Sequence, residues 1–390
     1  MTTQSNLRPD DVLSRSSALS RSLGLRADEA EALRELPAAT ISDVTEADLW
    51  RMVVPTSLGG HGLGLHTLAN STRLLAQGCP ASAWTISFLV MHSWLLTKFP
   101  AAARAEFFTR EQPWALTPAP LAPTGTVDAV DGGLRVTGRW EWATGVQHGE
   151  WVMVHAVQMA PVLATHFLVL PVADVRVDDV WHTSGMRATG SNAVVVDDVF
   201  VPSHRTIPSA ALMFGGDHLE GNGMAGLPVP QVLALMAAAP AVGAAEAAVE
   251  LYRQRMTGRV LAHSIGDRAK DQPVMQARLG AIIAELAAMR ANWDRAIARL
   301  MDVDDAHPIT LDERIDLRLA AAHTVRSARN IISTIGDCGG ASMYFSGSPF
   351  QRLQRDVETL KGHVIFDWDR TTELAGRVAL GLELRPADMV

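Results

Sequence analysis

The segment Arg139-Trp-Glu-Trp-Ala-Thr-Gly-Val-Gln-His148 carries two tryptophans two residues apart, followed by a hydroxyl side chain and a glycine. Side chains two residues apart point to the same face of a strand, so this spacing predicts Trp140, Trp142 and Thr144 on one face. Gly145 then allows a close backbone approach. Such a surface suits a planar ligand with the threonine hydroxyl at its edge. The alternative is a core strand followed by a turn, because aromatic strand residues are mostly core residues.

The composition is that of a globular chain. Its 390 residues suffice for two or three packed domains, with 48% hydrophobic and 19% charged side chains. The net charge of −8 and the lack of a dense Lys and Arg run argue against a nucleic-acid surface. The two cysteines, Cys79 and Cys338, cannot build a disulfide framework. Neither they nor the histidines show the spacing of metal ligands, so no metal site is predicted.

Two further observations bear on location. The first 17 residues contain no apolar segment of the kind found in secretory signals, so we expect a cytoplasmic protein. The stretch Leu227–Ala245 is uncharged over about the length that spans a bilayer. It contains Pro228, Pro230 and Pro240, however, and is rich in alanine, which is only weakly apolar. We therefore predict a buried bundle helix there and no membrane span.

The composition and the hydrophobic pattern of the sequence change twice along the chain. Residues 1–112 show apolar side chains at three- and four-residue spacing, which predicts an N-terminal helical domain. Residues 113–214 alternate in polarity and are rich in Val, Thr, Gly and Pro, which predicts a middle antiparallel β-domain. A linker, 215–226, leads into residues 227–390, where long helical segments predict a C-terminal four-helix bundle. The expected helices are Val232–Arg259, Pro273–Met301, Thr310–Thr334 and a last one that ends near Glu383.

The first segment is best interpreted together with a second one. This second segment is Ser184-Gly-Met-Arg-Ala-Thr-Gly-Ser-Asn-Ala-Val-Val-Val-Asp-Asp-Val-Phe-Val-Pro202. Together the two segments resemble the middle domain of the acyl-CoA dehydrogenase fold, a mainly α fold with a central β-domain. The resemblance covers nearly the whole chain. It points in particular to the oxygenase component of two-component flavin-dependent monooxygenases, and it implies that the Thr144 hydroxyl faces flavin N5. The implied flavin-binding residues are Trp142, Thr144, Gly145, Thr189 and Ser191.

A histidine in the N-terminal half is the first candidate for contact with substrate. His92 lies in Val90-Met-His-Ser-Trp94, within a strongly apolar predicted helix. A lone histidine in such a helix is ordinarily a hydrogen-bonded core residue. In the monooxygenases the corresponding helix carries a His-x-Trp sequence whose histidine points into the cavity above the flavin. The resemblance thus implies that His92 lines the substrate cavity.

The C-terminal candidates are His363 and Asp367, which lie four residues apart in Gly362-His-Val-Ile-Phe-Asp367. On a helix this spacing lets the two side chains meet. A carboxylate beside an imidazole raises its pKa and fixes its tautomer, as acid–base chemistry requires. The alternative is a surface pair of small energetic weight. Two-component flavin phenol hydroxylases show a similar Arg-Asp…His-x-x-x-Asp pattern, here beginning at Arg355-Asp356, so the resemblance implies that this pair faces substrate.

The glutamate that removes the α proton in acyl-CoA dehydrogenases has no counterpart here. Its usual place holds Val364, and its alternative place near Val232 holds no carboxylate. The dehydrogenase segment Arg-x-x-Phe-Gly, which holds the pyrophosphate of FAD, is replaced by Arg259-Val-Leu-Ala-His263. Both differences favour a monooxygenase with an exchangeable flavin. An acyl-CoA dehydrogenase with a displaced base and a non-catalytic scaffold remain as alternatives.

The function that the resemblance implies is hydroxylation of a small organic substrate, such as a phenol or a natural product. Reduced flavin, FMNH2 or FADH2, would come from a separate NAD(P)H:flavin reductase and react with O2 to a C4a-hydroperoxide. Thr144 would slow the loss of hydrogen peroxide. His92 and His363, the latter supported by Asp367, would orient or deprotonate substrate and protonate the peroxide. Relatives of this kind are usually homotetramers, so we expect the same assembly.

Overall fold

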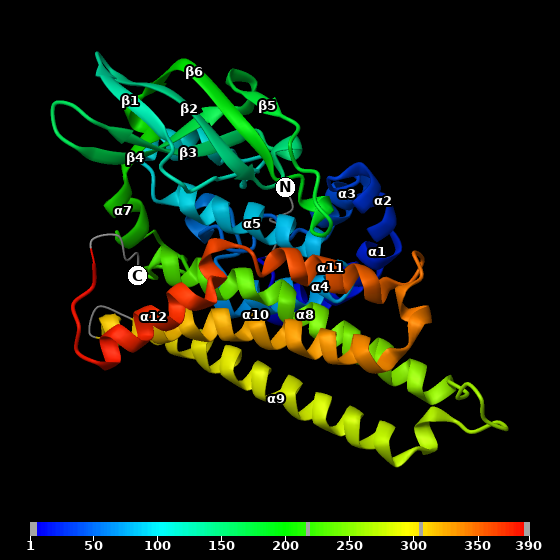
Figure 1. Ribbon diagram of the computed structural model, residues 1–390. Helices are drawn as coiled ribbons and strands as arrows, with labels where there is room; N and C mark the ends of the chain where they lie inside the picture. Colours follow the sequence, from blue (N-terminus) through cyan, green and yellow to red (C-terminus); the bar gives the residue numbers. More distant parts are fainter. Residues whose placement is uncertain (1–5, 216–218, 304–306, 386–390) are drawn as a thin grey trace.

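The computed structural model describes residues 6–215, 219–303 and 307–385. Expectations for residues 1–5, for 216–218 of the linker, for 304–306 and for 386–390 lie outside this part of the chain. Figure 1 shows a β-sheet at the top, the helices of residues 9–46 to one side and a long helical bundle below. This arrangement is the mainly α fold with a central sheet that the sequence predicts.

One of the N-terminal helices is buried along its whole length. That helix, α5, begins at Pro80, where the missing N–H of proline is not needed. All its residues are buried, which fits its apolar sequence and its place between the sheet and the bundle (Figure 1). The bounds are α1 Pro9–Leu25, α2 Ala27–Leu33, α3 Ala38–Glu46, α4 Leu65–Ala76, α5 Pro80–Thr97 and α6 Ala101–Phe107.

The central sheet is mixed, whereas the sequence analysis predicts an antiparallel one. Its strand order is β5-β6-β2-β1-β3-β4-β7. Strands β1 and β3 pair in parallel, because the chain reverses after β1 and again after β2 and so returns beside β1 in its original direction. The bounds are β1 Gly125–Val130, β2 Gly133–Ala143, β3 Trp151–Gln158, β4 Ala164–Pro171, β5 Arg176–Asp178, β6 Asn192–Pro202 and β7 Thr206–Pro208.

Strand β2 has a bulge near its end, so Trp140 and Trp142 do not share a face. The register with β6 shifts between Trp140 and Ala143, and Trp142 has a φ of 64°. Trp140 is completely buried and donates its Nε1–H to the carbonyl of His155 at 2.7 Å, whereas Trp142 is 65% exposed. The predicted common face is therefore wrong, because an extra residue in a bulge breaks the two-residue alternation.

The C-terminal bundle begins with three long helices at the predicted places, but the last predicted helix is two helices. The break spans residues 361–367, where the backbone of His363 is extended and a single 3-10 turn, Val364–Phe366, follows. A short helix, α7 Ser209–Phe214, precedes the bundle. The bundle bounds are α8 Val229–Gly258, α9 Pro273–Met301, α10 Leu311–Gly339, α11 Pro349–Leu360 and α12 Trp368–Ala379.

Helix α8 joins the N-terminal helices to the bundle. A Cβ atom at Gly243 would lie 2.2 Å from the carbonyl oxygen of Arg73, so α8 and α4 pack with their backbones in contact. The ion pair between Arg73 and Glu246, at 2.8 Å, spans the same interface. In the described part of the chain, α8 alone is long and apolar enough to cross a membrane, and 89% of its most apolar window is buried within the fold. The helices share one core, and the sheet has a second core around Trp140.

Candidate active site

Three hydroxyl side chains meet where β2 ends and β6 begins. The Thr144 Oγ1 atom lies 2.9 Å from Ser191 Oγ, which lies 2.7 Å from Thr189 Oγ1. All three residues are buried, and Thr144 is the most exposed of them at 9%. Each hydroxyl carries one proton, and the two contacts use two of these protons. We call this group the hydroxyl cluster; it keeps one O–H that is free to donate to a ligand.

Two glycines hold the hydroxyl cluster in place. The Gly145 amide donates to the carbonyl of Thr189 at 2.8 Å, which ties the end of β2 to the second segment. Gly145 has a φ of +71°, and a Cβ there would lie 2.9 Å from the Thr85 side chain on α5. Gly190 has a φ of +49°, in the left-handed region that favours glycine. The cluster therefore rests directly on α5.

Helix α5 also carries a row of rings. Trp84, Phe88 and His92 lie four residues apart and so share one face of the helix. The ring centroids of Trp84 and Phe88 are 4.5 Å apart, and those of Phe88 and His92 are 5.5 Å apart. His363 extends this aromatic row, with its centroid 5.6 Å from that of Trp84. Because Thr85 directly follows Trp84, the aromatic row and the hydroxyl cluster lie against adjacent faces of one helix.

His92 presents an unused hydrogen-bond acceptor. Its Nδ1 lies 2.7 Å from the carbonyl oxygen of Thr117. A carbonyl only accepts, so this contact assigns the proton to Nδ1 and leaves the lone pair on Nε2. That Nε2 is buried and has no hydrogen-bond partner among the described residues. Burial lowers the pKa of His92 to about 4, although the bond to Thr117 acts in the opposite direction. The ring is therefore neutral at neutral pH.

His363 has the opposite tautomer. It caps the 3-10 turn that follows it, and its Nδ1 accepts the Ile365 amide proton at 3.3 Å. The proton of the neutral ring is thus on Nε2, which makes that atom a donor. Burial lowers the pKa of His363 to about 4. The aromatic row therefore includes an acceptor nitrogen on His92 and a donor nitrogen on His363.

The predicted pairing of His363 with Asp367 is wrong in its geometry. The residues between them form a 3-10 turn rather than a turn of α-helix. Asp367 instead caps α12, where its side chain accepts the amide proton of Arg370 at 3.1 Å. Its side chain is exposed, and the pKa of His363 is lowered by burial rather than raised by a neighbouring carboxylate. The structure thus gives Asp367 a helix-capping role.

The sequence does not predict a role at this site for three further residues. Trp84 and Phe88 have the four-residue spacing of His92, but in an apolar helix this spacing is also that of ordinary core residues. Asp356 belongs to the Arg-Asp pair noted in the sequence. Its Oδ1 accepts the amide proton of Met186 at 2.6 Å, a contact between α11 and the second segment that spacing alone does not reveal.

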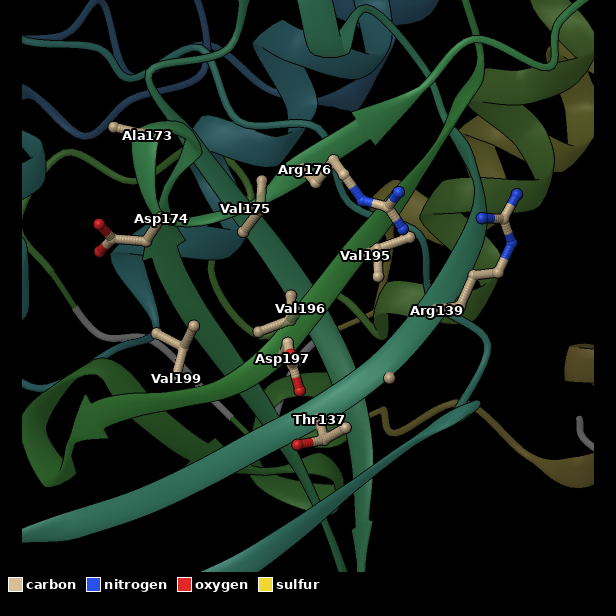
Figure 2. Close-up of a pocket in the computed structure, with 11 residues that line it drawn as sticks. Thr137, Arg139, Ala173, Asp174, Val175, Arg176, Val195, Val196, Asp197 and Val199 are labelled. Atoms are coloured by element: carbon tan, nitrogen blue, oxygen red, sulfur yellow. The ribbon is translucent and has the colours of Figure 1, made fainter.

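A shallow hollow lies on the sheet, away from these groups (Figure 2). Its lining comes from β2, β5, β6 and the turn before β5. Figure 2 shows Arg139 and Arg176 on one side and Asp174 on the other. None of the predicted flavin-binding or substrate-binding residues lines it, so it is not the site described above.

Comparison with known proteins identifies the family. Residues 235–368 match the family model "Acyl-CoA dehydrogenase, C-terminal domain". A pigment production hydroxylase of a Rhodococcus species is 32% identical over 95% of this chain and 97% of its own length. The oxygenase subunit HsaA of a flavin-dependent monooxygenase from Rhodococcus jostii is 30% identical over 95% of this chain and 99% of that protein. The chain belongs to the flavin-dependent monooxygenases.

A solved structure agrees with this assignment. The flavin-dependent monooxygenase fold is shared with XiaF from a Streptomyces species, whose structure is in complex with FADH2 and glycerol. The TM-score is 0.91 at 27% identity, over 98% of this chain and 97% of that chain. The protein is thus an enzyme, the oxygenase component of a flavin-dependent monooxygenase that uses reduced flavin and O2.

The positions that hold the catalytic base and the pyrophosphate-binding arginine in acyl-CoA dehydrogenases have other surroundings or other roles in this protein, which is consistent with a monooxygenase. Val364, at the usual place of the dehydrogenase base, is 56% exposed, and Val232 is completely buried. Arg259, the nearest counterpart of the pyrophosphate-binding arginine, donates to the carbonyl of Gly339 at 3.1 Å. Its guanidinium therefore stabilises the C-terminal end of α10. A proton acceptor is missing at both expected places, and the arginine is engaged within the bundle.

Proposed function

We propose that this monooxygenase hydroxylates a phenol, with reduced flavin at the hydroxyl cluster and the substrate along the aromatic row. The observation that carries the proposal is the unpartnered Nε2 of His92, a buried acceptor on an apolar, ring-lined face of α5. A phenol offers both a ring for this face and an O–H for this nitrogen. A buried acceptor that lacks a partner costs free energy, so a ligand that supplies the donor is favoured.

The residues at the hydroxyl cluster fit a flavin. The cluster has one O–H to donate, and Thr144 is its most exposed member. Trp142 is exposed two residues before it and offers a planar surface to a flavin ring. When bound, reduced flavin would activate O2, of which one oxygen atom goes to the substrate and the other to water. Thr144 and Ser191 would orient the flavin, and the buried setting of the cluster would exclude water.

The two histidines divide the work at the substrate. His92 accepts a hydrogen bond from the phenol at Nε2, and His363 donates one from its Nε2–H. Burial lowers the pKa of His92 to about 4, so in the ground state the ring orients the hydroxyl rather than removing its proton. The hydrogen bond still increases electron density on the phenol ring, which makes the ring a better nucleophile.

The oxygenase component depends on a separate reductase for its reduced flavin. We infer that this partner is an NAD(P)H:flavin reductase and that the oxygenase is a homotetramer. The exposed Trp142 beside the hydroxyl cluster supports an assembly in which a second subunit covers this region. A cytoplasmic location is supported by Cys79 and Cys338, which are both free thiols.

Anaerobic titration tests the proposal. Purified protein is titrated with FMNH2, FADH2, FMN and FAD, and we expect at least tenfold tighter binding of a reduced form. The reduced complex is then mixed with O2 and a panel of phenols, and hydroxylated product and hydrogen peroxide are measured. Tighter binding of oxidised FAD together with oxidation of an acyl-CoA would contradict the proposal, and so would a lack of hydroxylated product from every phenol.

A further inference from the structure

Asp356 connects helix α11 to the loop that leads into the hydroxyl cluster. Its Oδ1 accepts the amide proton of Met186 at 2.6 Å, and the residue is only 3% exposed. Met186 has a φ of 54°, and it begins the 3-10 turn Arg187–Thr189. The Asp356 carboxylate therefore holds the backbone at the point where the loop turns toward the cluster.

The backbone of this loop touches α11 directly. A Cβ at Gly185 would lie 2.0 Å from the carbonyl oxygen of Arg355 and 2.7 Å from the amide nitrogen of Asp356. The Arg355 guanidinium donates to the carbonyl of Ser184 at 2.5 Å. Three consecutive loop residues, 184–186, are thus fixed against one turn of α11, and a larger residue than glycine does not fit there.

A short path of hydrogen bonds leads from this contact to the hydroxyl cluster. The Thr189 amide donates to the carbonyl of Met186 at 3.2 Å, and the Thr189 carbonyl accepts from Gly145. The Thr189 hydroxyl is itself a member of the cluster. In the other direction, α11 ends at Leu360, shortly before His363. The same helix therefore positions both the cluster and the histidine at the end of the aromatic row.

The two arginines beside Asp356 on α11 form ion pairs with other residues. Arg352 pairs with Asp28 and Arg355 pairs with Glu31, so both arginines of α11 are directed to α2. Burial raises the pKa of Asp356 to about 7, and Glu31 adds to that effect, whereas the Met186 hydrogen bond and the two arginines act in the opposite direction. The second oxygen, Oδ2, is buried and has no partner among the described residues. Keeping a buried carboxyl here costs stability, which a role in the site would explain.

We propose that Asp356 is a positioning residue that holds the loop 184–191, and through it the hydroxyl cluster, in register with the aromatic row. The expected effect of Asp356 on flavin binding rests on the proposed function. The expected effect on the loop rests only on the contacts of Asp356, Gly185 and Met186, so the two effects can be tested separately.

Hydrogen–deuterium exchange of the flavin-free protein tests the loop. Asp356→Leu removes the acceptor for the Met186 amide, so we expect exchange in the peptide 184–191 to become about tenfold faster or more. Asp356→Asn keeps an acceptor oxygen of the same shape, and we expect exchange close to that of the wild type. Peptides from α9 serve as an internal reference, because that helix packs against α8 and α10 of the bundle.

Binding of reduced flavin tests the consequence for the site. We expect about tenfold weaker binding in Asp356→Leu and near-normal binding in Asp356→Asn, a rescue that a general loss of folding would not show. If Asp356→Leu does not fold, Gly185→Ala tests the same contact, because its methyl group would displace the loop from Arg355. Gly280→Ala is the matched control, since a Cβ at Gly280 meets nothing within 4 Å.

The outcomes separate the two proposals. Faster exchange together with weaker flavin binding in Asp356→Leu or Gly185→Ala supports the role of Asp356. Exchange at the wild-type level would overturn it, and so would unchanged flavin binding by a variant whose loop exchanges faster. A wild-type protein that bound no reduced flavin would instead contradict the proposed function, and the exchange rates would still decide whether Asp356 holds the loop.

Discussion

The hydroxyl oxygens of Thr144 and Ser191 lie 2.9 Å apart, although 47 residues separate them along the chain. Their contact follows from the register of the sheet. Strands β2 and β6 are antiparallel, with Ala143 opposite Asn192, so the next residue of one strand faces the preceding residue of the other. The position of the hydroxyl cluster is therefore set by the pairing of the two strands.

The first prediction concerns the Thr144 hydroxyl. Thr144→Val keeps the shape of the side chain and removes its hydrogen bonds. If the hydroxyl stabilises the bound flavin, losing one hydrogen bond costs about 1–3 kcal/mol, or roughly a ten- to hundredfold faster release of hydrogen peroxide. The measurement is peroxide and product formed per flavin oxidised. Thr124→Val is the control, because it removes a hydroxyl bonded to the Arg139 carbonyl outside the site. A peroxide yield equal to that of the wild type would exclude Thr144 from this role.

The spacing of apolar residues and the local composition predict most of the helices and the position of the sheet. The apolar residues at three- and four-residue spacing and the change in composition near residue 113 locate the helices and the sheet. The parallel pairing of β1 with β3 does not follow from such patterns, because it depends on which side of β1 the chain returns to. The pairing of strands depends on contacts between residues far apart in the sequence, which the local spacing of apolar residues does not predict.

Two features of the predicted site are wrong because the backbone between the residues concerned is irregular, and the flavin-binding role of the hydroxyl cluster stays a prediction. Strand register brings Thr144 beside Ser191, and the 3-10 turn Arg187–Thr189 brings the Thr189 hydroxyl beside Ser191 as well. Trp142 leaves the expected face because of a bulge, and His363 does not meet Asp367 because the helix is broken between them. Both errors arise from extending a period of two or of four residues across an irregular backbone.

The second prediction separates the two tryptophans of β2. Trp142→Ala should weaken binding of reduced flavin and cost less stability than Trp140→Ala, because the Trp142 side chain is 65% exposed within its own subunit. Trp140→Ala should cost about 3–5 kcal/mol of stability, because it removes a completely buried ring from the core of the sheet. Flavin titration and thermal unfolding of the two variants give the comparison. A Trp142→Ala variant that bound flavin normally would place that ring outside the flavin site.

The third prediction isolates the acceptor nitrogen of His92. His92→Asn can keep a donor to the Thr117 carbonyl, but it removes the Nε2 acceptor. We expect a roughly tenfold weaker affinity for the phenol, as expected for the loss of one hydrogen bond, and a larger share of peroxide. Flavin binding should remain normal. Ser93→Ala, which removes a hydroxyl bonded to Ala115, is the neighbouring control that should lower stability without affecting coupling. Equal substrate affinity in His92→Asn and the wild type would contradict the assignment.

The fourth prediction follows from the separation of His363 and Asp367. His363→Ala should continue to consume O2 but release more hydrogen peroxide in place of product, because it removes the donor at the end of the aromatic row. Asp367→Ala should lose about 1 kcal/mol of stability through the missing cap of α12 and keep normal coupling. Product and peroxide yields, with urea unfolding, measure both effects. Uncoupling by Asp367→Ala as strong as that by His363→Ala would show that the two residues act as a pair.

The last prediction concerns the dependence of stability on pH. The pKa of His92 is lowered from 6.5 to about 4, and that of His363 is lowered to about 4 as well, both by burial. Well above pH 6.5 each ring is neutral in the folded and unfolded states, so protonation of the two rings does not change the stability there. As the pH falls from 6.5 toward 4, the unfolded chain binds protons that the folded protein does not, and stability decreases.

At about 1.4 kcal/mol per pKa unit, His92 alone accounts for roughly 3 kcal/mol of this decrease at pH 4. The raised pKa of Asp356 has the opposite sign, since its destabilising effect grows as the pH rises from 3.8 toward 7. Each variant must therefore be compared with the wild type at the same pH. Urea unfolding between pH 4.5 and 7.5 should show that His92→Asn loses less stability on acidification than the wild type. Parallel curves for the two proteins would mean that His92 titrates normally in the folded state.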